Sequence, residues 1–98
     1  MEYIKHKRDE IQIIRDIISA TIAYGHQGTT KIICKANLSP SMFKTYISRL
    51  TTQGYVHVAA YPEGKRLRKS YRVTDKGLQF YNKLDEFRLM HSTLLGGG

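Results

Sequence analysis

Apolar residues recur at helical spacing along the first half of the chain, most clearly between Thr29 and Gly54. Ser39 can cap a helix there, and Pro40 follows at the first helical position, where its missing N–H costs nothing. At about 100° per residue, one side of the helix at 40–53 is apolar and the other carries hydroxyls and bases without an acid. The apolar side holds Phe43, Tyr46, Ile47 and Leu50; the polar side holds Ser41, Lys44, Thr45, Ser48 and Thr52, with Arg49 at its margin.

Two further helices precede this one. Asp9 can cap a helix that runs to Tyr24, and Gly25 is expected to end it in a left-handed conformation. Thr29 or Thr30 is expected to cap a short second helix that leads into a turn at 37–39. The first helix carries a broad apolar face, and the second turns Ile32, Ile33 and Ala36 inward with Cys34 close to the same core.

After Gly54 the pattern alternates as in strands. Two β-prone runs, 55–61 and 70–73, flank a turn and a basic tip at 62–69, which predicts a β-wing whose basic part is 62–70. Thr74 can cap a last helix, in which apolar residues and one histidine recur every three or four positions. This seam, which predicts pairing with a second subunit, consists of Phe80, Leu84, Phe87, His91 and Leu94.

Charge is concentrated in the same middle segment. The chain has 98 residues and a net charge of +8, and the segment Thr29–Arg72 holds nine bases against one acid, Glu63. The other residues hold seven bases and seven acids. Since the whole excess lies in one segment, a phosphate-backbone partner is favoured over a generally solvated basic surface.

Two stretches, TKIICKANLSPSMFKTYISRLTTQGYV (Thr30–Val56) and YRVTDKGLQFYNKL (Tyr71–Leu84), resemble the small archaeal winged-helix transcriptional regulators, cellular or viral. The resemblance rests on the KANLS turn, the Tyr-Ile-x-x-Leu spacing before a glycine, and Tyr-x-x-Thr-x-Lys-Gly at the last helix. It implies a helix–helix–helix–strand–strand–helix order, DNA binding that is sequence-specific or chromatin-type, and dimerisation through the C-terminal helix. Some members have a much longer C-terminal coiled coil than this chain.

The expected fold class is therefore α+β and mostly helical: a winged helix-turn-helix with three helices, a two-stranded β-wing and a C-terminal helix. The chain divides into a basic N-terminal arm (1–8), a winged helix-turn-helix domain (9–77), a dimerisation helix (78–95) and a disordered tail (96–98). The arm is either frayed or touches phosphate or a minor groove.

The leading hypothesis is a homodimeric regulator that binds double-stranded DNA. The recognition helix would enter the major groove and place five side chains nearest the bases: Ser41, Lys44, Thr45, Ser48 and Arg49. The wing would hold flanking phosphates or the adjacent minor groove through Lys65, Arg66, Arg68 and Lys69. The second helix would fix the register on phosphate through Thr30, Lys31 and Lys35.

Three other functions stay open on the residues alone. They are a general chromatin-type DNA-binding protein, a winged-helix protein-interaction module and an RNA-binding protein. An enzyme is not expected, because the histidines are scattered, no metal-ligand spacing occurs and no glycine pattern matches a nucleotide loop. We therefore expect no metal and no cofactor. A single cysteine, and the lack of any apolar run long enough to cross a bilayer, favour a cytoplasmic protein without a membrane partner.

Overall fold

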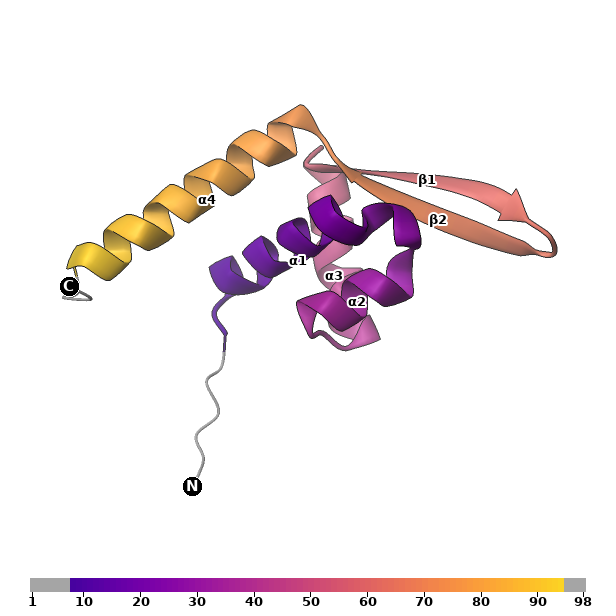
Figure 1. Cartoon of the computed structure of the whole chain (residues 1–98), viewed down its shortest axis with the longest axis horizontal. Helices are drawn as coiled ribbons and strands as arrows, with labels where there is room; N and C mark the ends of the chain where they lie inside the picture. The colour runs from indigo at the N-terminus through magenta and orange to yellow at the C-terminus, as the bar shows by residue number, and fades with distance from the viewer. Residues whose placement is uncertain (1–7, 95–98) are drawn as a thin grey trace, which may run out of the picture.

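The computed structural model of the protein describes residues 8–94 (Figure 1). The order is α1 (Glu10–Tyr24), a 3-10 turn η1 (Gly25–Gln27), α2 (Thr29–Ala36), α3 (Pro40–Thr52), β1 (Val56–Glu63), β2 (Arg66–Val73) and α4 (Asp75–Leu94). This order and the mostly helical composition confirm the predicted fold class. Residues 1–7 of the predicted arm and the whole predicted tail lie outside the described residues.

Three predicted caps start three of the helices. Asp9 accepts a hydrogen bond from the N–H of Gln12 at 2.8 Å, and Ser39 accepts one from the N–H of Met42 at 3.2 Å. Thr74 accepts from the N–H of Gly77 at 3.0 Å. Each cap satisfies a backbone donor that has no partner inside its own helix, so the helix starts are fixed by local chemistry.

One hydrophobic core joins the three N-terminal helices to the base of the wing. Ile17, Ile18 and Ile32 are fully buried, and Phe43 and Leu50 bring α3 onto them. The ring of Phe43 meets that of Tyr71 edge to face, with 5.8 Å between centroids. Because α3 is held by its apolar side, its opposite side faces solvent, as the periodicity predicts.

The wing is a longer ribbon than the sequence predicts. β1 and β2 pair antiparallel from Val56 opposite Val73 to Glu63 opposite Arg66, so the connecting turn is only two residues long. Most of the predicted basic tip is therefore strand. Pro62 is tolerated inside β1 because each strand of a two-stranded ribbon is an edge strand and has backbone N–H groups that need no partner. Figure 1 shows the ribbon extending from the helices at the end opposite to the C-terminus.

Three local predictions were wrong. Gly25 has right-handed backbone angles (φ −57°) and begins η1; its lack of a side chain matters because a Cβ there would overlap the carbonyl of Tyr71. Gly28, not a threonine, precedes α2, and no side chain caps this helix; the Thr29 hydroxyl instead bonds the hydroxyl of Tyr71 at 2.6 Å. Cys34 is exposed rather than close to the core, because it lies on the side of α2 opposite to Ile32 and Ala36.

The first half of α4 packs on the domain. Its Phe80 ring stacks on Tyr55 with 4.3 Å between centroids, and Arg15 of α1 donates two hydrogen bonds to Asp85 at 2.9 and 3.1 Å. Farther along the predicted seam, Leu84 is half-buried and Phe87 is 53% exposed. The seam residues His91 and Leu94 have side chains outside the described part, so the seam is followed only as far as Phe87.

Candidate nucleic-acid interface

The outer side of α3 is open to solvent. Its exposed side chains are the polar set expected from the sequence, which is Ser41, Lys44, Thr45, Ser48 and Thr52. The hydroxyls form a stripe along the helix, and its two bases flank that stripe on opposite sides. The Thr45 hydroxyl donates to the carbonyl of Ser41 at 3.1 Å, and its acceptor capacity is left toward solvent. A polar, uncovered helix of this kind can present both donors and acceptors to a partner.

Arg49 differs from the other polar residues of α3 because it has a partner in α1. Its guanidinium lies 3.0 Å from a carboxylate oxygen of Glu10 and over the ring of Tyr46, 5.2 Å from the centroid. The Tyr46 hydroxyl donates to the same oxygen at 3.5 Å. Arg49 remains more than half exposed, so its position at the margin of the polar face agrees with the periodicity, but its charge is shared with an acid.

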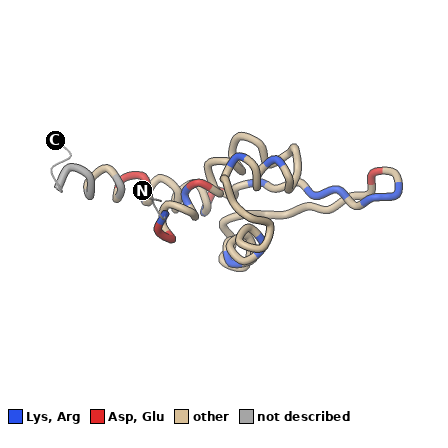
Figure 2. Tube along the Cα trace, turned by 90° about the horizontal axis from the view of Figure 1, so that it is seen from below, with Lys and Arg blue, Asp and Glu red and all other residues tan. Residues whose placement is uncertain are grey.

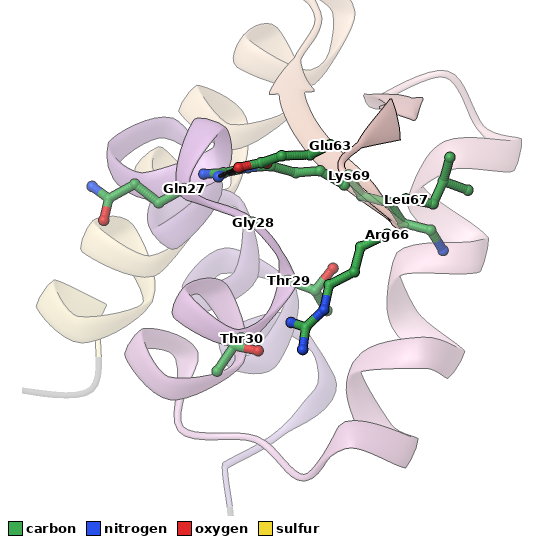
Figure 3. Close-up of a pocket in the computed structure, with 9 residues that line it drawn as sticks. Gln27, Gly28, Thr29, Thr30, Glu63, Arg66, Leu67 and Lys69 are labelled. Carbon is green, nitrogen blue, oxygen red and sulfur yellow. Dashed lines mark hydrogen bonds and ion pairs between the residues drawn. The ribbon is translucent and has the colours of Figure 1, made fainter. Parts of the chain in front are cut away.

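A groove separates the wing from the start of α2 (Figure 3). It has a volume of about 560 Å³ and is lined by Gln27, Gly28, Thr29, Thr30, Glu63, Arg66, Leu67, Arg68 and Lys69. Figure 3 shows Arg66 extending from the wing toward Thr29 and Thr30. The two threonines lie in the first turn of α2, where backbone N–H groups without helical partners and the helix dipole favour an anion. The tertiary fold therefore combines a basic side chain and a helix start that are more than thirty positions apart.

The four wing bases predicted to bind DNA are not equivalent. Arg68 donates to the carboxylate of Glu63 at 3.1 Å, and this hydrogen bond and charge raise the pKa of Arg68 further above its ordinary value. Within the described part of the chain, Lys65, Arg66 and Lys69 have no such acid partner. Three wing bases are thus available to an external anion, whereas the fourth is partly neutralised.

Lys31 and Lys35 lie in a separate place from the groove. Both ammonium groups sit over the ring of Tyr24 at the end of α1, 5.4 and 5.2 Å from its centroid. The ring attracts both cations, so it holds two like charges close together on one side of α2. Thr30, from the same predicted set, lines the groove instead.

Charge is segregated along the molecule (Figure 2). Lys and Arg follow the wing and mark α2 and α3, whereas six of the seven described acids lie in α1, α4 or the residue before α1.

Sequence reasoning missed two members of the site, Gln27 and Gly28, because neither carries a charge. It also placed Arg8 in a free arm, whereas its guanidinium bonds Asp16 at 2.7 Å and the carbonyl of Ala36 at 2.8 Å.

Among residues 8–94, no group of three or more His, Cys, Asp or Glu side chains is arranged to hold a metal ion. No helix within residues 8–94 combines the length and apolar character that a membrane span needs.

Comparison with known proteins identifies the fold family. A winged helix-turn-helix family model matches residues 7–92. The chain belongs to this family. It is also 29% identical over 89 residues to the uncharacterized protein MJ0287 of Methanocaldococcus jannaschii, covering 90% of this chain and 82% of that protein.

Several solved structures are similar in fold to this protein over most of its chain. Sso10a-2, a DNA-binding protein from Sulfolobus solfataricus, matches with a TM-score of 0.74 at 23% identity, over 92% of this chain and 88% of that one. The protein smu.1704 from Streptococcus mutans matches with a TM-score of 0.78 at 18% identity, over 95% and 92%. The PcaV transcriptional regulator from Streptomyces coelicolor matches with a TM-score of 0.73 at 22% identity, over 88% of this chain and 63% of PcaV. The archaeal matches confirm the resemblance to archaeal winged-helix proteins.

Proposed function

We propose that the protein is a homodimeric regulator that binds double-stranded DNA through α3 and the wing. The observation that carries the proposal is the outer side of α3, which is exposed, rich in hydroxyls and free of acids. Two similar structures are named as a DNA-binding protein and a transcriptional regulator, which supports the same class of partner. A protein-docking helix would instead expose several apolar anchors. Among the large apolar side chains of α3, only Met42 is exposed, at 39%.

In this proposal α3 reads bases in the major groove. Ser41, Thr45 and Ser48 have hydroxyls that serve several base edges, and Lys44 can pair with the acceptors of guanine. Arg49 can make the same contact in bidentate form once it exchanges Glu10 for a base.

The groove between the wing and α2 would hold the phosphate backbone. Arg66 and Lys69 supply charge from the wing, and Thr30 with the start of α2 supplies backbone and hydroxyl donors from the other side. Lys65 at the turn would reach the next phosphates or the adjacent minor groove. Lys31 and Lys35 would add phosphate contacts beside Tyr24.

Dimerisation would use the distal half of α4. The exposed apolar side chains there include the seam residue Phe87 and, on the same side of the helix, Met90, which are 53% and 64% exposed. A second copy covering them would place two α3 helices on one duplex. Two-fold symmetry then predicts half-sites about one helical turn apart, roughly 34–36 Å, or a multiple of that spacing.

Selection of bound duplexes from a random pool tests the proposal. An enriched palindrome would support a site-specific dimer, and binding without enrichment would favour the chromatin-type alternative. Shift assays on duplex DNA and single-stranded RNA should be run over a salt series, because phosphate contacts make affinity fall steeply with salt. Preference for RNA, or no binding to any nucleic acid, would refute the proposal.

A further inference from the structure

The carboxylate of Glu10 pairs with a base of α3. Glu10 is the first residue of α1, and its carboxylate reaches the last turns of α3, where it touches both Arg49 and Tyr46. The positive end of α1 favours a carboxylate at this position, and the negative end of α3 favours a cation at Arg49. The pair therefore connects two helix ends whose dipoles both support it, although the residues are 39 positions apart.

We infer that Glu10 is a specificity-determining residue. Its carboxylate competes with DNA for Arg49, so that a base edge replaces the carboxylate as the partner of Arg49 and a lone phosphate does not. The inference rests on the proposed function. Arg49 and Lys44 are the two bases of α3. Of these two, only Arg49 is paired with an acid of the described residues. A DNA contact through the same guanidinium nitrogen must therefore displace a carboxylate oxygen at 3.0 Å.

The competition acts differently on random and preferred duplexes. A backbone phosphate that replaces Glu10 offers Arg49 a similar oxygen anion and leaves the Glu10 carboxylate beside a polyanion, so little is gained. A guanine offers two uncharged acceptors in the planar geometry that the guanidinium matches, and contact with it keeps the nearest phosphates farther from Glu10 than direct contact with a phosphate would. Glu10 thus weakens binding to random duplex more than binding to a site that presents guanine to Arg49.

Geometry supports exchange rather than permanent pairing. Both side chains are more than half exposed, at 57% for Arg49 and 59% for Glu10, so solvent screens the pair and it opens readily. In the paired state the Tyr46 ring also lies against the guanidinium, which sits at the edge of the polar face of α3.

The wing offers a matched control. Glu63 holds Arg68 at 3.1 Å, nearly the same distance as in the Glu10–Arg49 pair, and its side chain is exposed to a similar extent. Arg68 would meet phosphate only. Removing the charge of Glu63 should therefore strengthen binding to every duplex by the same factor, whereas removing that of Glu10 should not.

The experiment compares Glu10→Gln, Glu63→Gln, Arg49→Ala and the double variant Glu10→Gln with Arg49→Ala. Fluorescence anisotropy measures dissociation constants for a duplex enriched from the random pool and for a random duplex of equal length. Glu10→Gln should tighten binding to the random duplex about two- to fivefold and change binding to the enriched duplex less. The specificity ratio, which is the dissociation constant of the random duplex divided by that of the enriched duplex, should therefore fall. Circular dichroism melts of each variant show that it is folded.

Three results have distinct meanings. An equal effect of Glu10→Gln on both duplexes overturns the inference, and so does an undiminished effect in the Arg49→Ala background, because the carboxylate would then act only as general charge. A fall in the ratio that requires Arg49, with no such fall for Glu63→Gln, supports it. If the unmodified protein binds neither duplex, it is the proposed function that fails.

Discussion

Replacing Arg66 and Lys69 together by alanine tests whether the wing binds phosphate through charges that the protein leaves unpaired. Both side chains line the groove opposite the start of α2, and neither has an acid partner in the described part of the chain. Arg68, between them, is held by Glu63 at 3.1 Å and contributes less. We therefore expect this pair of bases to make two full phosphate contacts.

The size of the effect follows from counterion release. Each phosphate contact contributes about 0.9 to the slope of log affinity against log salt, so the double variant should have a slope shallower by about 1.8. Between roughly 50 and 200 mM salt, this difference amounts to about a tenfold smaller loss of affinity than in the unmodified protein. The change should be equal on random and enriched duplexes, because phosphate carries no sequence information.

Anisotropy titrations at five or more salt concentrations measure the slope. Lys83→Ala, on the exposed part of α4 away from the groove, removes one charge outside the proposed interface and should leave the slope unchanged. Arg68→Ala should reduce the slope by less than one contact because Glu63 already compensates its charge. An unchanged slope in a folded Arg66→Ala/Lys69→Ala variant would refute the wing assignment.

Three further variants test the fold and the assembly. Ser39→Ala removes the cap of α3 and should lower the free energy of unfolding by about 1 kcal/mol in urea titrations. Gly77→Ala places a Cβ against the carbonyl of Tyr55 and 2.8 Å from a methyl of Val73, so thermal melts should show a loss of about 1–3 kcal/mol, and an unchanged melt would contradict this packing. Phe87→Ala should weaken self-association in sedimentation equilibrium by about 1.5–3 kcal/mol per buried ring, and equal dimer affinity would remove Phe87 from the interface.

Much of the fold was predictable because its signals are local. The caps at Asp9, Ser39 and Thr74 each act on a backbone donor three residues away, so a short stretch of sequence contains the whole interaction. The periodicity of α3 likewise separates Phe43 and Leu50 from the polar side without knowledge of the other elements. The concentration of charge between Thr29 and Arg72 is a property of the sequence itself.

The tertiary structure decided how those charges are used. Which arginines carry an acid partner depends on packing: Glu10 meets Arg49 only because α1 crosses α3, and Arg66 faces Thr30 only because the ribbon lies over the start of α2. The two close backbone approaches at Gly25 and Gly77 also depend on distant elements, which is why a left-handed cap was wrongly expected at Gly25. Helix caps form between residues a few positions apart, and helix faces follow from the spacing of apolar residues, so both can be predicted from a short stretch of sequence. Partners of a long charged side chain are fixed only when separate elements come together, and no short-range pattern encodes that meeting.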